Sequence, residues 1–408
     1  MNVGTPRVLA PGLAAAAAVL LAGYLYTRPA LTRDPGASAP APPAKSPRWT
    51  VLPGLSGSER ASLPYPPDVL PGGRHVDTPY GSLHVYEFGP TAGPRVLLLH
   101  GIGTPCLALG RMARALADGG CRVMLFDFFG RGYSDAPDDL PYDSRLYATQ
   151  ILLALASSPL PWTGDDAFHL VGYSLGGAIA ASFARYHPHT VRSLSLVAGG
   201  GLIRTHHVST KSRLLYSEGT FPERLLRTLI RRRLWPEVGG PADMPEAEVS
   251  DDAPAPSKKA ETVESDARGG SSFDDALLAD GRPDLTVSRV MAWQLTHHEG
   301  FVGAYKSTIL HAPIYAQGDT EWKPLRGLLE ARRRDDGLPG LKGGQVLLVL
   351  GETDPVIVPS EMEEDARRVL GHEAIIVKVI AGAGHEVGIT QGREVADLIA
   401  ETWGLYKT

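Results

Sequence analysis

Cysteine and asparagine are nearly absent from this chain of 408 residues. The two cysteines, Cys106 and Cys121, belong to no CxxC pair and no Cys/His cluster, which argues against a disulfide framework or a cysteine zinc site. They could form a single bridge, but two buried thiols are the simpler interpretation. Asn2 is the sole asparagine, so the lack of a glycosylation sequon carries no information. Excess positive charge is also lacking, because the net charge is -5, and we expect no nucleic-acid partner.

Charged residues are missing from positions 8–27, near the N-terminus. An apolar run of this length is sufficient to span a bilayer as a helix. We therefore predict that residues 1–28 form an uncleaved single-pass membrane anchor, with a cleaved signal peptide or an organelle-targeting segment as alternatives. More Lys and Arg residues follow the run than precede it. This asymmetry predicts that the large C-terminal part of the chain faces the cytosol, while a cleaved signal would make the protein secreted or organellar.

The central and C-terminal parts of the chain alternate between two patterns. After a Pro/Ala-rich stretch at 29–73, predicted to be a linker, a hairpin is expected at 75–88. Short apolar runs, typical of strands buried on both faces, then occupy 95–101, 121–129, 168–174, 191–200, 345–354 and 374–384. Helical patterns lie between them at 111–118, 144–157, 177–186, 360–370 and 394–403. The alternation predicts an α/β fold with a mostly parallel sheet flanked by helices.

A long interval separates the fourth apolar run from the fifth. We predict a helical cap or lid at 201–335, inserted after the fourth core strand, between core segments 74–200 and 336–408. Residues 237–285 within it are acidic and rich in Pro, Ser and Ala, which predicts a disordered loop. Residues 286–311 return to helical periodicity.

A Gly-x-Ser-x-Gly pentapeptide occupies 172–176, with Ser174 at its centre. It follows the apolar strand residues FHLV at 168–171 and precedes a predicted helix. A tight strand-to-helix turn needs glycines on both sides and lifts the serine hydroxyl above the sheet edge. It also directs the amide of Leu175, at the helix N-terminus, toward a developing oxyanion. We predict that Ser174 is a nucleophile.

A serine nucleophile needs a base, and the base needs an orienting acid. His385 lies in a Gly-rich turn after the last predicted strand, and Asp354 follows the strand before it. We predict that His385 is the general base and Asp354 the acid, with Glu352 as the alternative acid. The second oxyanion donor is expected in the turn after the first core strand, where we choose the amide of Ile102.

The ordered set of motifs resembles the α/β-hydrolase family. The matching motifs are HG at 100–101, DFFGRGYSD at 127–135, GYSLGG at 172–177, GETD at 351–354 and GH at 384–385. The resemblance implies an esterase- or lipase-like serine hydrolase with a triad and a cap. Epoxide hydrolases and dehalogenases of this family carry an aspartate at the nucleophile position, so Ser174 argues against both.

The predicted function is therefore cleavage of a carboxylic ester through an acyl-enzyme. The predicted membrane anchor and the aromatic residues of the cap favour a lipid-like ester. A thioesterase, amidase or C–C bond hydrolase with the same triad is the alternative, as is a non-catalytic binding protein tethered to a membrane. Substrate contacts are assigned to Tyr173, Trp293, Phe301 and Tyr305, although the cap residues among them could equally pack on the core. The oligomeric state is left open.

We expect neither a cofactor nor a metal. The glycine-rich turns at 101–103 and 130–132 lack the third glycine of a dinucleotide fingerprint. The adjacent histidines at 206–207 and at 297–298 should point apart in a helix or strand.

Overall fold

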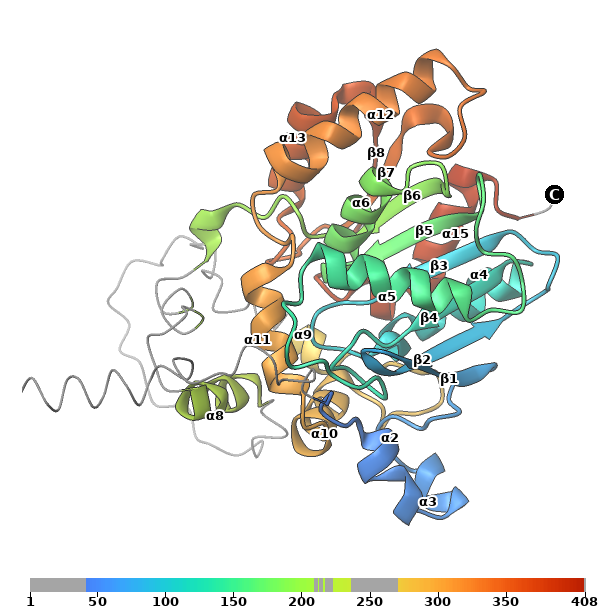
Figure 1. Ribbon diagram of the computed structural model, residues 1–408. Helices are drawn as coiled ribbons and strands as arrows, with labels where there is room; N and C mark the ends of the chain where they lie inside the picture. Colours follow the sequence, from blue (N-terminus) through green and yellow to red (C-terminus); the bar gives the residue numbers. More distant parts are fainter. Residues whose placement is uncertain (1–41, 209–211, 213–215, 217–222, 236–270, 407–408) are drawn as a thin grey trace, which may run out of the picture.

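The computed structural model describes residues 42–208, 212, 216, 223–235 and 271–406 (Figure 1). The predicted anchor, residues 1–28, lies outside these ranges. None of the helices in the described part of the chain combines the length and apolar character needed to cross a membrane. The longest, α5 (Ser144–Ala156), has 13 residues, whereas a span takes about 20. The prediction of a single-pass anchor is thus not supported.

An eight-stranded sheet forms the centre of the molecule (Figure 1). Its order is β1-β2-β4-β3-β5-β6-β7-β8. The first pairings, β1 with β2 and β2 with β4, are antiparallel, and all the others are parallel. The strands are β1 (Gly73–Thr78), β2 (Gly81–Phe88), β3 (Arg95–Leu99), β4 (Arg122–Phe126), β5 (Phe168–Tyr173), β6 (Val191–Val197), β7 (Val346–Gly351) and β8 (Ile375–Ile380). The predicted α/β class is confirmed.

Each predicted apolar run contains a strand, but the strands stop before the runs do. The run at 95–101, for example, gives β3, and His100 and Gly101 belong to the following loop. Because the central strands are covered on both faces, β5 and β7 have every residue buried. By contrast, β8 is an edge strand, and Val379 is 51% exposed. The polar ends of the runs therefore lie in loops at the carboxyl edge of the sheet.

Helices cover both faces of the sheet (Figure 1). On one face, α4 (Gly110–Asp118) packs against α15 (Gly392–Trp403). On the other, α5 contacts α6 (Leu175–Tyr186). The remaining predicted core helix is α13 (Pro359–Leu370). All five agree with the helical patterns in the sequence.

From residue 42 onward the N-terminal arm is packed against the core, which differs from the linker predicted for 29–73; residues 29–41 lie outside the described ranges. From residue 42 onward it forms α2 (Pro47–Thr50), η1 (Leu52–Gly54) and α3 (Gly57–Ala61). Tyr65 is fully buried, and its hydroxyl donates to the carboxylate of Asp127 at 3.1 Å. The amide and hydroxyl of Ser46 donate to Asp135. The arm orders because its side chains find buried partners that composition does not reveal.

The described part of the segment between β6 and β7 is largely helical. It contains η3 (Thr205–His207), α8 (Glu223–Leu234), α9 (Ser271–Asp274), α10 (Val287–His297), α11 (Phe301–His311), η5 (Gly318–Trp322) and α12 (Lys323–Arg334). Part of the loop predicted to be disordered, residues 271–285, is ordered instead, because Ala276, Leu278 and Leu285 are buried. The rest of that loop, 237–270, lies outside the described residues. The division into core and cap stays a prediction.

Candidate active site

Ser174 occupies a sharp turn between β5 and α6. Its backbone has φ 53° and ψ −118°, a conformation that costs about 1–3 kcal/mol and persists only where the surroundings enforce it. Two glycines make room for the turn. A Cβ on Gly172 would lie 2.2 Å from the carbonyl oxygen of Gly176, and one on Gly176 would lie 2.2 Å from that of Leu99. The strand–turn–helix setting inferred from the pentapeptide is present.

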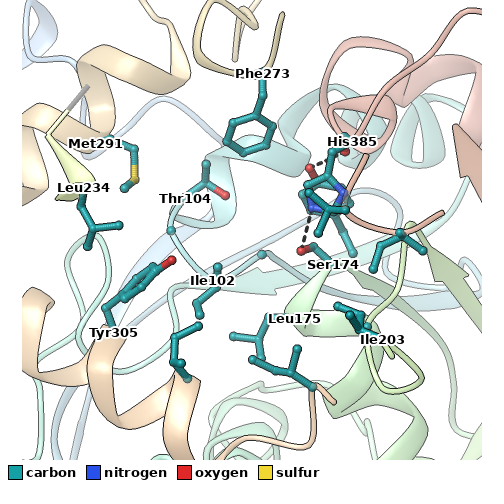
Figure 2. A pocket seen from close by; sticks show the side chains of 18 of the residues that line it. Ile102, Thr104, Ser174, Leu175, Ile203, Leu234, Phe273, Met291, Tyr305 and His385 are labelled. Atoms are coloured by element: carbon teal, nitrogen blue, oxygen red, sulfur yellow. Dashed lines mark hydrogen bonds between the residues drawn. The ribbon is translucent and has the colours of Figure 1, made fainter. Parts of the chain in front are cut away.

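Three loops at the carboxyl edge of the sheet bring Ser174, His385 and Asp354 together. Figure 2 shows the contact between Ser174 and His385. The Oγ of Ser174 lies 3.0 Å from Nε2 of His385. On the other side of the ring, Nδ1 of His385 lies 2.9 Å from Oδ2 of Asp354. A carboxylate can only accept, so Nδ1 carries the proton and Nε2 is left to accept from the serine hydroxyl. This arrangement can deprotonate Ser174.

Asp354 is held rigidly by its own loop. Its Oδ1 accepts hydrogen bonds from the amides of Val356 at 2.8 Å and Ile357 at 2.9 Å. The Asp354 side chain is fully buried. Glu352, the alternative acid, is exposed and accepts from the amide of Gly382 instead. Asp354 is therefore the carboxylate that contacts His385.

Tyr173 supports the histidine loop. Its hydroxyl donates to the carbonyl oxygen of His385 at 2.8 Å. Burial, followed by the negative charge of Asp354, raises the pKa of this hydroxyl well above its usual value, so it remains a donor. The ring of Tyr173 also lines the cavity over Ser174. Tyr173, predicted to contact substrate, therefore also positions the His385 loop, a role that the sequence did not reveal.

Ile102 and Leu175, the predicted oxyanion donors, both line the same cavity as Ser174. Leu175 is the first residue of α6, so its amide has no carbonyl partner within the helix. Ile102 lies in the loop that follows β3. The two predicted donors thus flank the serine from separate segments of the chain.

Buried side chains hold the loop that carries Ile102. Nε of Arg131 donates to the carbonyl oxygen of Ile102 at 2.8 Å. Gln294, on α10, donates to the carbonyl of Gly103 at 3.0 Å and accepts from the amide of Gly132 at 2.8 Å. Since burial lowers the pKa of His100 to about 3, that ring is neutral and donates to the carbonyl of Gly101. Sequence reasoning missed these contacts because they join segments far apart in the chain.

A cavity opens over Ser174 (Figure 2). It holds about 910 Å³ of empty space, part of it open to solvent. Helices between β6 and β7 supply one wall, through Leu234, Phe273, Met291 and Tyr305. Aliphatic side chains contribute most of the rest, namely Ile203, Ile309, Ile314, Val356 and Ile357, and Thr104, Asp274 and Tyr315 add polar groups. The cavity is therefore mostly apolar, with the serine and histidine at its surface.

Two of the predicted substrate contacts do not line this cavity. Trp293 packs edge-on against Tyr133, with ring centroids 5.5 Å apart. It lies two residues after Met291, which places it on the opposite side of the helix. Phe301 is fully buried beneath the guanidinium of Arg131. Of the three predicted contact residues between β6 and β7, only Tyr305 lines the cavity, whereas Trp293 and Phe301 pack in the interior, which was the alternative left open.

The sequence profile described as alpha/beta hydrolase fold matches residues 94–391. This range covers most of the chain and includes all three residues of the hydrogen-bonded relay. The chain belongs to the α/β-hydrolase fold family. Its family membership agrees with the sheet order and with the loops that carry Ser174, Asp354 and His385.

Characterised relatives of this α/β hydrolase match over limited stretches. It is 34% identical over 122 residues to Lipase 1 of Psychrobacter immobilis, covering 30% of this chain and 37% of that protein. It is 42% identical over 107 residues to the pimeloyl-(acyl-carrier protein) methyl ester esterase of Chromobacterium violaceum, covering 26% and 37%. The chain thus spans well under half the length of these curated relatives. They support a hydrolase of the lipase and esterase kind.

Solved structures share the fold of this α/β hydrolase at low identity. Carboxylesterase CesB from Bacillus subtilis is 18% identical, with a TM-score of 0.53, and the match covers 84% of this chain and 94% of that one. A membrane phospholipase A, described as a bacterial virulence factor, is also 18% identical, with a TM-score of 0.53 and coverage of 99% and 100%. These likenesses establish the architecture alone.

The histidine pairs behave differently from each other. His297 is exposed and His298 is buried, so their side chains diverge as expected. The rings of His206 and His207, however, lie with centroids 4.1 Å apart, because the pair is in the short turn η3 rather than in a helix or strand. The argument that this pair points apart was wrong. Cys106 and Cys121 are both buried and free, which agrees with the simpler interpretation.

Proposed function

We propose that this α/β hydrolase is a serine esterase that cleaves a carboxylic ester through an acyl-enzyme intermediate. The observation that carries the proposal is the continuous relay from Ser174 through His385 to Asp354 at the wall of an apolar cavity. A hydroxyl, a correctly oriented imidazole and a buried carboxylate are the groups that acyl transfer by a serine requires.

In the first half of the reaction, Oγ of Ser174 attacks the ester carbonyl carbon while Nε2 of His385 takes the hydroxyl proton. Asp354 stabilises the imidazolium through Nδ1–H. The amides of Leu175 and Ile102 donate to the oxyanion, and one such donor is worth about 10²- to 10³-fold in rate. His385 then gives its proton to the departing oxygen as the carbon–oxygen bond breaks, which releases the alcohol.

In the second half, water replaces the alcohol. His385 takes a proton from the water as the water oxygen attacks the acyl carbon. The tetrahedral intermediate then collapses, its bond to Ser174 breaks, and His385 returns the proton to the serine oxygen. The products are a carboxylic acid and the free enzyme.

The cavity lining supports a substrate with an apolar chain, such as a lipid-like ester. Burying each methylene of such a chain is worth about 0.8 kcal/mol. The proposed cap consists of the helices between β6 and β7, which contribute Leu234, Phe273, Met291 and Tyr305. The relatives named as a lipase and as a methyl ester esterase support an ester as the cleaved bond.

The test is labelling of the full chain with a fluorophosphonate probe, combined with turnover of p-nitrophenyl esters of increasing acyl length. Wild type should be labelled and should hydrolyse the esters. Ser174→Ala should lose both, whereas Ser360→Ala, which alters an exposed serine, should keep both. Labelling that persists in Ser174→Ala would contradict the nucleophile assignment.

A parallel panel of thioesters, amides and C–C bond substrates separates the alternative reactions. Suppose that the probe labels Ser174 but an activated thioester or amide is turned over faster than every ester. The assignment of an ester as the cleaved bond would then be wrong, whereas the assignment of the catalytic triad would stand. If the folded chain neither reacts with the probe nor hydrolyses any substrate, the binding-protein alternative is favoured.

A further inference from the structure

A cluster of two histidines and one carboxylate lies close to the catalytic cavity, in part along a small neighbouring cavity. His206 and His207 come from η3, and Glu361 comes from the first turn of α13. Nε2 of His207 is 2.7 Å from Oε2 of Glu361, and Nε2 of His206 is 4.0 Å from Oε1. One potential ligand atom from each residue lies within 4.8 Å of the other two. The three side chains therefore converge on one point from two separate elements.

These separations suit a small divalent cation. A zinc ion holds imidazole nitrogen and carboxylate oxygen at about 2.0–2.2 Å, so neighbouring ligand atoms in a tetrahedral site are about 3.3 Å apart. The His207–Glu361 separation of 2.7 Å is below that value, the His206–Glu361 separation of 4.0 Å is above it, and all three ligand atoms lie within 4.8 Å of one another. Modest side-chain rotations would equalise them. His206 is exposed, and the other two side chains are half-buried, so an ion can enter from solvent.

The Glu361 carboxylate is hydrogen-bonded to His207 and has only a long contact with a neighbouring cation. Arg204 is the nearest cation, but its guanidinium contacts Asp365 at 2.8 Å and Glu364 at 2.7 Å, and is 3.8 Å from Glu361. Asp365 also pairs with Arg368. Glu361, Glu364 and Asp365 supply three carboxylates against the two guanidiniums of Arg204 and Arg368. A divalent cation would thus enter a site whose surplus charge is negative.

We propose that His206, His207 and Glu361 bind a divalent transition-metal ion, with water in the remaining position, and that Zn²⁺ is the ion best suited to this donor set. Mixed imidazole and carboxylate ligands fit zinc better than calcium or magnesium, which prefer oxygen alone. This site goes beyond the proposed esterase function and does not depend on it.

A metal here would join two segments that border the active site. Ile203 precedes η3, and Val356 and Ile357 precede α13. All three line both the catalytic cavity and the small neighbouring cavity that His207 and Glu361 line. The amides of Val356 and Ile357 also hold Asp354. Metal binding therefore cross-links one wall of the cavity and should raise the thermal stability of the chain.

The experiment uses the full chain without a histidine tag, stripped with EDTA and dialysed against buffered Zn²⁺. Bound zinc is then measured by plasma mass spectrometry. Wild type should retain one equivalent. His206→Ala, His207→Ala and Glu361→Gln should each weaken binding by more than about tenfold, because even the loss of a group that only orients a ligand costs about 10- to 100-fold.

Matched controls are His189→Ala and Glu373→Gln, which alter exposed residues outside the cluster and should bind zinc like wild type. His385→Ala excludes the catalytic histidine as the zinc ligand and should also bind normally. The melting temperature of wild type should rise with zinc concentration, and the rise should disappear in Glu361→Gln. The proposal is overturned if wild type retains no zinc and does not change its melting temperature, or if all three cluster variants bind as wild type does.

Discussion

The two halves of the active site are built in different ways. Ser174, Asp354 and His385 each follow a strand of one sheet, so the main chain alone brings them to the same edge. The opposite wall consists of side chains from helices between β6 and β7, including Phe273 and Met291. Their positions depend on how those helices pack. The reactive groups are therefore set by the topology of the sheet, whereas the shape of the cavity is set by tertiary contacts.

The largest expected effect comes from a change in the triad, the part of the active site that the sheet positions. Asp354→Asn should lower kcat by about 10⁴-fold, because the amide favours the wrong histidine tautomer. Glu352→Gln changes a carboxylate in the same loop that does not contact His385 and should leave kcat within about twofold, as expected for a surface substitution. Steady-state ester hydrolysis measures both. Equal losses in the two variants would mean that topology alone does not select the acid.

The second prediction concerns how the helices between β6 and β7 are held on the core, at the junction between α10 and α11. Nε2 of His298 donates to the carbonyl of Ser134 at 2.8 Å, and Nδ1 accepts from the amide of Gly300 at 3.2 Å. Burial lowers the pKa of His298 to about 4, while the unfolded chain titrates near 6.5. Between these values the unfolded state binds more protons, so the unfolding free energy falls as the pH decreases.

The contribution of His298 across that window is up to about 3 kcal/mol. Urea unfolding of wild type at several pH values should show the decline, and His298→Gln should flatten it. His297→Gln, at the exposed neighbouring position, should keep the wild-type slope. Identical slopes in all three proteins would show that His298 does not respond to pH in this way.

Gln294 links the two halves, because it lies on α10 and binds the loop that carries Ile102. Gln294→Leu should shift that loop and lower kcat by roughly tenfold, since a displacement of 1 Å at a reacting group can cost about 100-fold. KM should change little. Thr296→Ala, at an exposed position of the same helix, is the control. A change in KM with an unaltered kcat would indicate a role in substrate binding instead.

The smallest effect concerns the cavity wall. Met291→Trp should shorten the preferred acyl chain, because the larger ring occupies space that a chain would fill. Each methylene excluded should reduce kcat/KM by about fourfold, from about 0.8 kcal/mol per buried group. Trp293→Phe, two residues away and outside the lining, should keep the chain-length profile and lower stability instead. If Trp293→Phe changed the preferred acyl-chain length instead, Trp293 rather than Met291 would be the residue that contacts the acyl chain.

The sheet and the reactive groups could be predicted from the sequence because each depends on local pattern. Buried strands produce continuous apolar runs, and the residues after them lie at a common edge. Gly172 and Gly176 were informative because the turn has no room for a side chain at either position. The assignment of Asp354 over Glu352 followed from similar reasoning, and the structure supplies the contact.

Other features depend on contacts between distant segments, which composition does not encode. Tyr65 lies in a Pro-rich stretch that predicts a linker, yet its hydroxyl reaches Asp127. Trp293 and Met291 share one amphipathic helix, and only packing decides which of them lines the cavity. The contact between His206 and His207 is local, and it was missed for a different reason: the sequence did not predict the short turn η3 that brings the two rings together.

The buried tyrosine of the N-terminal arm has a practical consequence for anyone who shortens this chain. A version beginning at β1 would retain every strand and all three triad residues, yet it would leave Asp127 without the hydroxyl of Tyr65 and Asp135 without Ser46. Asp127 also accepts hydrogen bonds from the amides of Cys106 and Tyr133, and Asp135 accepts one from the amide of Ser82. The smallest active fragment should therefore start upstream of Ser46, well before the first strand.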